Sequence, residues 1–392
     1  MSCELISHSP DLEALRRDGY EVGIVDNHVV LRNVPYVNAQ RVVLRGTLMT
    51  PLTLAGDRTD TPGTHVVYFA GEYPCQRDGT PIEALRHSSE RTALGPNLIA
   101  DHSFSNKPSA GFPDYETLLR SYATILEGPA AALDPNATAR TGRVVELSED
   151  ESVFRYPDTS TSRAGIGKAV ESLALADVAI VGLGGTGSYI LDLVAKTPVK
   201  RIHLFDDDDF LTHNAFRSPG AATLDELRTR PRKVAYLAER YAPMRRGIHP
   251  HPIRIDASNV GQLAKMSVVF ISVDDGPTRR LIVDALIEAG VSFVDVGMGV
   301  LQVDDRLLAT VRVSASTPQQ PNDFDVRREM HFAPAMKDDY DTNIQIADLN
   351  ALNAVLAVIR WKKAAGFYAD HEYEHHSTFT TNTHLLTSSG CA

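Results

Sequence analysis

The sequence is poor in cysteine, in long apolar runs and in positive charge. Its 392 residues include only three cysteines, Cys3, Cys75 and Cys391, and no C-x-x-C pair. This excludes a disulfide framework and a four-cysteine zinc site, and it is typical of a reducing compartment. No apolar run approaches the ~18 residues that a membrane-spanning helix needs. The net charge of -11 argues against nucleic acid as a partner, because phosphate-binding surfaces are usually basic.

The first residues lack the basic start and the long apolar stretch of a signal peptide. We therefore expect a cytoplasmic protein without a membrane partner. The apolar content of 43% and the charged content of 23% are ordinary for a globular chain. The length is sufficient for two domains with substantial cores.

A polar, turn-rich segment divides the chain. Asp134-Pro135-Asn136 is a turn signal, and residues 148–151 are acidic or polar. We therefore expect one domain over 1–150 and another over 151–392. We expect the first domain to be mixed α+β, because short apolar strands precede a segment of helical periodicity. These strands are expected over 22–25, 29–31, 41–48 and 65–69, and the helix over 118–126.

From residue 160 onward, apolar strands alternate with segments of helical periodicity. The strands are expected over 178–181, 201–205, 248–255, 268–273, 291–296 and 307–313. Helices are expected over 165–173, 185–196, 279–289 and 346–365, and helical segments over 224–241. A polar tail follows residue 365 and runs to Ala392. Such alternation predicts an α/β fold with a doubly wound, mainly parallel sheet.

A glycine-rich turn follows the first strand of this second domain. Gly182, Gly184 and Gly187 satisfy G-x-G-x-x-G, and Gly185 lies within the same turn. Glycine lets backbone N–H groups approach a phosphate closely where a helix begins. Asp206 ends the next strand, at the distance expected of a carboxylate that binds a ribose. The pattern predicts a nucleotide site without defining the reaction.

Further polar residues make the pattern more specific. Asp208, Asn214, Arg217, Lys233 and Asp274 follow in this order. Together with the glycine turn, this order resembles the ubiquitin-activating superfamily, the ThiF/MoeB/HesA-type adenylyltransferases. The resemblance covers roughly residues 160–365.

The resemblance implies an enzyme that uses ATP and Mg²⁺ to adenylate the C-terminal carboxylate of a ubiquitin-like or sulfur-carrier protein. It implies that Asp206 holds the ribose and that Asn214, Arg217 and Lys233 contact the phosphates. Asp274 would hold Mg²⁺, a cation that prefers oxygen ligands, with Asp275 as a possible substitute. The nucleotide-binding set comprises Gly182, Gly184, Gly185, Gly187, Asp206 and Asp208.

Relatives also carry an arginine on the helix before the first strand, where it often reaches the partner subunit. Arg163 is our candidate for this role, and Arg155 competes with it. The resemblance implies a homodimer. The first domain resembles an appended domain of bacterial activating enzymes encoded beside ubiquitin-like systems. We expect it to recruit a protein partner, and a conjugating enzyme is a further candidate partner.

The chain also departs from the family pattern, because residues 206–390 contain no cysteine. We therefore expect no zinc and no thioester within the folded domain. Cys391 lies one residue from the C-terminus, a position that does not favour catalysis. The acyl group would pass either directly to another protein or to a hydroxyl. Ser314, Ser316 and Thr317 lie in the relevant segment, but the sequence identifies no base to activate them.

Two alternatives remain open from the sequence. The same fold serves NAD(P)-dependent oxidoreductases, and it also serves catalytically silent scaffolds. His249 and His251 would share one face of a strand, but a metal site there lacks a third ligand. In the first domain, Cys75 with His65 or His102 could be read as a catalytic pair, although a packed thiol is favoured.

Overall fold

The computed structural model describes residues 2–109, 111–143, 152–164, 166–318, 330 and 344–390, without the side chains of 2–4, 162, 163 and 390. It forms two compact units, which we describe separately. One comprises Met1–Ser152 with Tyr156–Gly167, and the other Val153–Arg155 with Lys168–Ala392. The segment Tyr156–Gly167, which we expected in the second domain, therefore belongs with the first unit.

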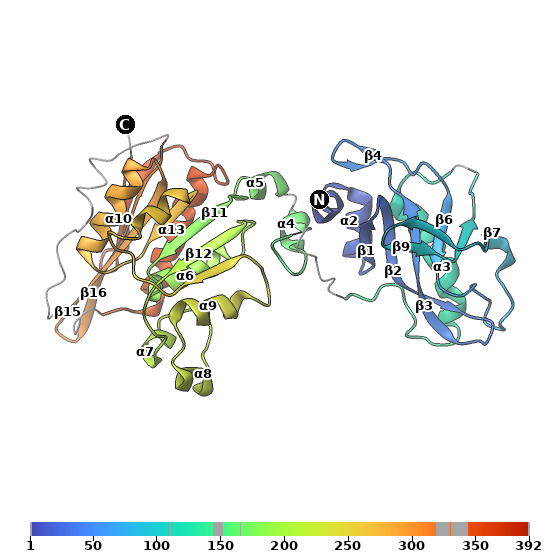
Figure 1. Ribbon diagram of the computed structural model, residues 1–392, viewed down its shortest axis with the longest axis horizontal. Coiled ribbons are helices and arrows are strands. Elements are labelled where there is room, and N and C mark those ends of the chain that lie inside the picture. Colours follow the sequence, from blue (N-terminus) through green and yellow to red (C-terminus); the bar gives the residue numbers. More distant parts are fainter. Residues whose placement is uncertain are drawn as a thin grey trace. The chain divides into compact units, whose positions relative to one another are not determined.

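The first unit is built on a six-stranded antiparallel sheet of order β1-β2-β3-β6-β10-β7 (Figure 1). Asp26 and Asn27 both have positive φ and make the tight turn between β1 and β2. The sheet strands are β1 Glu21–Val25, β2 His28–Val37, β3 Val43–Pro51, β6 Val66–Ala70, β7 Arg86–Ser88 and β10 His102–Ser105. The minor strands are β4 Leu54–Ala55, β5 Arg58–Thr59, β8 Thr92–Gly95 and β9 Leu98–Ala100.

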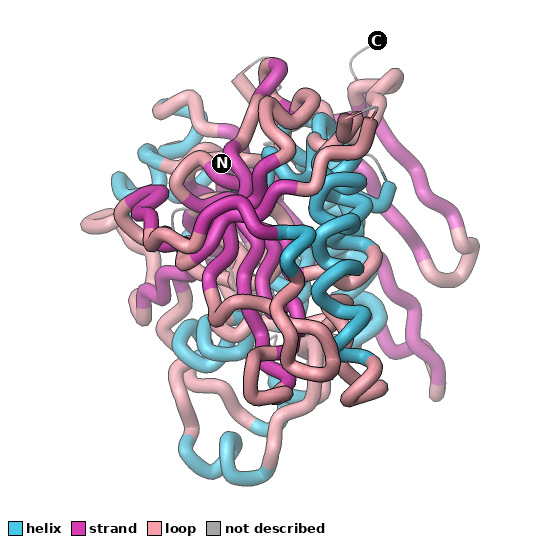
Figure 2. Tube along the Cα trace, turned by 90° about the vertical axis from the view of Figure 1, so that its right-hand side faces the viewer, coloured by secondary structure: helices cyan, strands magenta, loops and turns pink. Residues whose placement is uncertain are grey.

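One long helix, α3 (Tyr115–Ala131), lies beside the sheet of this unit (Figure 2). It begins at Asp114, whose side chain accepts a hydrogen bond from the backbone N–H of Thr117. Its apolar side packs Leu118 and Tyr122 against the buried residues of the sheet. The other helices are α1 Ser2–His8, α2 Pro10–Arg17, η1 Glu83–Leu85 and α4 Thr159–Ala164.

The second unit contains an eight-stranded sheet of order β13-β12-β11-β14-β15-β16-β17-β18. The first five strands are parallel and the last three add antiparallel pairs, so the expected fold class is confirmed. The strands are β11 Asp177–Val181, β12 Arg201–Phe205, β13 Ile248–His251, β14 Val268–Ile271, β15 Ser292–Val303, β16 Arg306–Ser316, β17 Glu374–Thr380 and β18 Leu385–Gly390.

Helices cover both faces of this sheet. One face packs against α6 (Gly185–Val194), α9 (Lys233–Tyr241) and α13 (Ala347–Ala364). The other packs against η2 (Val260–Lys265) and α10 (Gly276–Glu288). The chain order reverses between β11 and β14, so a crevice is expected beyond their carboxyl ends. The remaining helices are α5 Gly167–Glu171, α7 Thr212–Ala215 and α8 Leu224–Thr229.

The helical segments expected over 224–241 are the two helices α8 and α9, which are separate because Arg230 is left-handed and Pro231 follows it. Two other expectations about this unit are wrong. The strand expected over 248–255 ends at His251, just before Pro252. The polar tail contains β17 and β18, since β17 pairs with β16 and β18 pairs with β17.

Candidate functional site

The glycine turn joins β11 to α6 at the point where the sheet order reverses. Gly182 has a φ of +86°, and a Cβ there would lie 2.4 Å from the backbone oxygen of Ser272. A Cβ on Gly187 would lie 1.9 Å from the backbone oxygen of Gly182. Packing of the turn against itself and against the end of β14 therefore requires both glycines.

Gly184 differs from the other glycines of the turn. It is the N-cap of α6, and a Cβ placed on it would meet nothing within 4 Å. Folding of the turn therefore leaves space beside Gly184, and the free N–H groups of a ten-residue helix begin there. Such a position attracts anions, because the helix dipole and the N–H groups act together.

Asp206 closes the other side of the turn. Its Oδ2 accepts a hydrogen bond from the backbone N–H of Leu183 at 2.6 Å, and its Oδ1 accepts one from Asp208 N at 2.9 Å. The side chain is 8% exposed, and burial raises its pKa against the opposing charge of Lys233, 3.6 Å away. The carboxylate therefore braces the glycine turn in addition to any contact with a ribose.

Lys233 opens α9 and lies against two acids of the Asp206–Asp209 run. Its Nζ is 2.6 Å from Oδ2 of Asp208 and its side chain is 7% exposed. Asp208 is largely exposed. The buried ammonium is thus held at the edge of the site by a carboxylate that water also reaches.

Asn214 and Arg217 carry polar atoms that have no partner in the described part of the chain. Asn214 is 2% exposed, and its Oδ1 accepts from the backbone N–H of Leu211, which leaves its buried Nδ2 without an acceptor. Nε of Arg217 is also buried and unpaired. Burial lowers the pKa of Arg217, and the charges of Asp274 and Asp208 oppose this shift. The guanidinium therefore lies within electrostatic range of both carboxylates.

Asp274 follows β14 and is exposed. The neighbouring Asp275 has a structural role, since its Oδ2 accepts from N and Oγ1 of Thr278 and caps α10. These hydrogen bonds hold the pKa of Asp275 below its usual value. It is therefore a poor substitute for Asp274 as a metal ligand.

The structure adds one acidic cluster that we did not expect. Among the described residues, one group of three side chains of the metal-binding types (Asp, Glu, His or Cys) has all its ligand atoms within 4.8 Å of one another. This group is Asp206, Asp207 and Asp208. The sequence signal is the run of four aspartates, Asp206–Asp209, in which only Asp206 and Asp208 were expected to have a role. Asp274 does not belong to this trio, so the magnesium ligand remains a prediction.

Of the two candidate arginines near the first strand, the structure describes the side chain of Arg155 and not that of Arg163. Arg163 falls in α4, but its side chain lies outside the described residues. Arg155 donates from Nε to the backbone oxygen of Ala242 at 2.6 Å. Ala242 follows the last turn of α9, whereas Lys233 begins that helix, so Arg155 is placed at the other end.

Sequence reasoning assigned no role to Asn350, which the structure places behind the glycine turn. Its side chain is fully buried, and its Oδ1 accepts from Thr186 Oγ1 at 2.8 Å. Its Nδ2 lies 2.1 Å from the position of a Cβ on Gly185. Position 185 must therefore be glycine, because a side chain there would clash with Asn350 of α13. The two residues are far apart in the sequence, so no local pattern predicts their contact.

Ser314 gains a neighbouring base that the sequence could not name. Its Oγ lies 2.9 Å from Nδ1 of His376 on β17, and Arg312 donates to the same Oγ at 2.8 Å. However, Ser314 is fully buried and Ser316 is 6% exposed. Neither hydroxyl is open to the carboxyl terminus of another protein in this conformation.

In the first unit, the thiol of Cys75 is buried, and burial raises its pKa. In the described part of the chain, no hydrogen bond or ring contact joins it to His65 or His102, which bond Ser105 and contact aromatic rings. A thiol held in its neutral form, away from imidazoles, is a poor nucleophile. The arrangement does not support a Cys/His catalytic pair.

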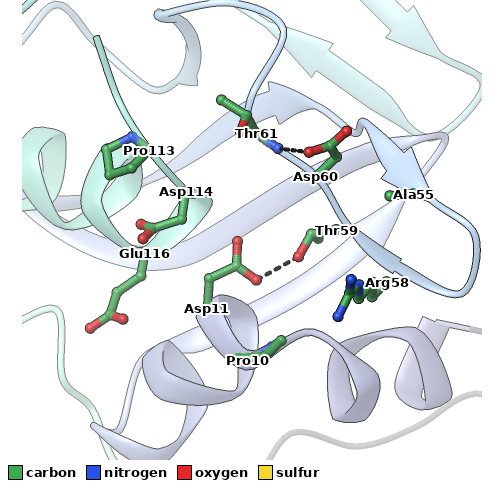
Figure 3. A pocket seen from close by; sticks show the side chains of 10 residues that line it. All are labelled: Pro10, Asp11, Ala55, Arg58, Thr59, Asp60, Thr61, Pro113, Asp114 and Glu116. Atoms are coloured by element: carbon green, nitrogen blue, oxygen red, sulfur yellow. Dashed lines mark hydrogen bonds between the residues drawn. The ribbon is translucent and has the colours of Figure 1, made fainter. Parts of the chain in front are cut away.

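A shallow cavity of about 410 Å³ lies in the same unit (Figure 3). Carboxylates of Asp11, Asp60, Asp114 and Glu116 line it beside Arg58. Asp11 and Asp114 each accept a backbone N–H at the start of α3, and Asp60 accepts one within its own loop. Because these acids are occupied in holding the fold, we assign the cavity no ligand.

None of the helices formed by the described residues is long and apolar enough to span a lipid bilayer.

No curated protein matches the sequence. Solved structures to which the chain is similar include Escherichia coli MccB with ATP, at 14% identity and a TM-score of 0.45, with 59% of this chain and 72% of that one covered. MccB with MccA-N7isoASN has the same identity and TM-score, covering 59% and 71%. PaaA has 15% identity and a TM-score of 0.47, covering 86% and 97%.

Two family models match the chain. Residues 10–159 match a domain of unknown function, DUF6791. Residues 161–325 match the ThiF family, which confirms the expected resemblance. The chain therefore carries a ThiF family domain over residues 161–325, preceded by a domain of unknown function.

Proposed function

We propose that the protein is an adenylyltransferase that uses ATP to activate the C-terminal carboxylate of a peptide or protein. In this reaction a carboxylate oxygen attacks the α-phosphorus of ATP, and the bond from that phosphorus to pyrophosphate breaks. Such chemistry depends on positioning and on neutralising phosphate charge. The ThiF family match and the residues around the glycine turn support the assignment.

One observation carries the proposal. Asn214 and Arg217 hold buried N–H donors that have no acceptor among the described residues. A buried, unpaired donor is costly, so it is expected where a ligand completes the hydrogen bond. A phosphate beside Gly184 would supply acceptors to these donors and to the N-terminus of α6.

Four further residues receive a role in the proposal. Lys233 neutralises phosphate charge as a point charge, and Asp206 holds the ribose while bracing the turn. Asp274, an exposed carboxylate within electrostatic range of Arg217, would hold Mg²⁺, which would withdraw charge from the phosphates. Arg163 would reach the neighbouring subunit's site in a homodimer.

We further propose that the activated carboxylate belongs to a ubiquitin-like or sulfur-carrier protein and that the first unit recruits a protein partner, such as a conjugating enzyme. Ser314 and Ser316 are buried and Thr317 is half-buried, which favours direct transfer of the acyl group to a nucleophile on another protein. No cysteine in residues 206–390 could accept it as a thioester. We place the protein in a bacterial, cytoplasmic conjugation system.

The test is ATP–pyrophosphate exchange by the full chain with a panel of candidate carriers. Each carrier is supplied with a free C-terminus and, as a matched control, with an amidated one. The proposal predicts exchange that needs the free carboxylate and that falls strongly in Arg217→Ala and Asp274→Ala. Exchange that is absent with every carrier, combined with tight NADH binding, would favour the oxidoreductase alternative.

A further inference from the structure

Four aromatic rings form a ladder across β12 and β13. The carboxyl end of β12 adjoins the glycine turn, because the backbone oxygen of Phe205 accepts from Gly182 N at 2.9 Å. The two strands are parallel, with His203 opposite His249 and Phe205 opposite His251. The ring of His203 lies 5.1 Å from that of His249 and 5.3 Å from that of His251, with planes within 20° of parallel. Phe205 stacks on His251 at 4.4 Å. The register therefore gathers three imidazoles on one face of the sheet edge.

Asp177 orients the central imidazole. Its Oδ1 lies 2.9 Å from Nε2 of His203, and Arg201 holds the same carboxylate through two contacts of 2.6 Å. The guanidinium of Arg201 favours the ionised form of this carboxyl group. A carboxylate only accepts, so Nε2 carries a proton, and Nδ1 of the neutral ring is an acceptor.

That acceptor faces a second imidazole. Nδ1 of His203 and Nε2 of His251 are 3.0 Å apart and share one proton in a hydrogen bond. Two ligands of a tetrahedral zinc ion, each ~2.0–2.1 Å from the metal, lie roughly 3.4 Å apart. A metal ion that takes the place of the shared proton therefore requires only a small separation of the two rings. The contact of His203 with Asp177 has the form of the carboxylate that orients a metal-binding histidine.

We infer that His203, His251 and His249 form a binding site for a divalent transition-metal ion of the zinc class, with Asp177 orienting His203. As the rings stand, the three histidines do not bring three nitrogens within 4.8 Å of one another. His249 is exposed and must rotate about its side-chain bonds to become the third ligand. Water completes four coordination.

The donor atoms distinguish this site from the acidic cluster beside the glycine turn. Imidazole nitrogens favour zinc, copper or nickel, whereas the Asp206–Asp208 carboxylates favour magnesium or calcium. Excess Mg²⁺ therefore separates the two sites.

The experiment titrates Zn²⁺ into the metal-free full chain in excess Mg²⁺, against a chromogenic chelator, with Co²⁺ absorption as a second probe. We expect one tight equivalent and an intense four-coordinate cobalt spectrum. His203→Asn and His251→Ala should each weaken binding at least about tenfold, and Asp177→Asn by about 10–100-fold. His249→Ala should bind zinc more weakly and lose the four-coordinate spectrum.

Matched controls are His87→Ala in the first unit, His371→Ala in the histidine-rich segment before β17, and Asp207→Asn. These should bind zinc as the unmodified chain does, and thermal unfolding should confirm that every variant is folded. The inference fails if zinc does not bind, or if His203→Asn and His251→Ala both retain full affinity. It also fails if His371→Ala alone removes the tight equivalent.

Discussion

At the scale of single residues, glycines of one turn have different physical reasons to be glycine. Gly187 is required by the fold, because a Cβ there would lie 1.9 Å from the backbone of Gly182. Gly184 is not, because a Cβ there would meet nothing within 4 Å. Space that folding leaves open beside a helix N-terminus is space for a ligand.

We predict that Gly184→Ala and Gly187→Ala separate binding from stability. Gly187→Ala should destabilise the second unit by about 1–3 kcal/mol through overpacking. Gly184→Ala should leave the unfolding curve nearly unchanged and weaken ATP binding, because the new methyl occupies the phosphate position. Thermal unfolding and calorimetric titration with ATP test the pair. Equal loss of stability in both variants would contradict this reading.

Arg217 gives a second residue-scale prediction. Its guanidinium is desolvated and its Nε has no partner among the described residues, so removing it costs the folded state little. Arg217→Ala should keep or slightly raise the melting temperature while lowering exchange activity by about 10²–10³-fold. Arg217→Lys should restore part of the activity, because it keeps the charge but loses the planar fork. A large drop in melting temperature would show instead that Arg217 is structural.

The sequence pattern predicted the identities of these residues but not their contacts. The order of Asp206, Asn214 and Arg217 is visible along the chain. Whether Nδ2 of Asn214 finds a partner depends on how loops from different strands meet. The lone pair of His203 likewise depends on Asp177 and on the register of β12 with β13, which no local signal encodes.

At the scale of elements, α6 is held at both ends. Its N-terminus faces the site, and its C-terminus is fixed by Arg245, which is 1% exposed. The guanidinium donates to the backbone oxygens of Ala195, Thr197 and Val199 just after the helix. Burial lowers the pKa of Arg245 to about 10, so the group remains charged at neutral pH.

We predict that Arg245→Met destabilises the second unit by about 3 kcal/mol, because several buried carbonyls lose a charged donor. Arg245→Lys should not recover this, since one ammonium cannot reproduce the fork. Trp361 is the single tryptophan and is buried in the core of this unit, so its fluorescence during urea unfolding reports the change. An unshifted unfolding midpoint would show that the carbonyls find other donors.

The elements that the sequence predicted well are those with strong local patterns. β11, β12 and β14 are buried parallel strands and read as continuous apolar runs. β17 escaped prediction because it is mostly polar, with Arg312 and Ser314 of β16 opposite it. Its partner lies some 60 residues earlier in the chain, so only the assembled sheet reveals it.

At the scale of the whole molecule, stability should depend on pH through Asp177. Its pKa is lowered to about 2 by Arg201 and His203, and the group is 15% exposed. A carboxyl whose pKa is lower in the folded state stabilises the fold above its unfolded pKa, and this contribution is lost as the pH falls toward 2. The shift corresponds to about 2 kcal/mol at pH 7.

We therefore predict that Asp177→Asn lowers the unfolding free energy by about 2 kcal/mol at pH 7, and that the gap closes between about pH 5 and pH 2. Urea unfolding followed by Trp361 fluorescence at several pH values measures it for the second unit. Arg201→Gln should produce a smaller loss with the same pH dependence. A gap that stays constant down to pH 2 would show that the carboxylate charge is not the cause.

The central claim is that a nucleoside triphosphate binds where β11, β12 and β14 end, against Gly184 and Arg217. The most direct test is calorimetric titration of the full chain with ATP–Mg²⁺ and, separately, with NADH. The account predicts that ATP binds, that Arg217→Ala weakens this binding at least about tenfold, and that NADH does not bind. Tighter binding of NADH than of ATP, or ATP affinity unchanged in Arg217→Ala, would contradict it.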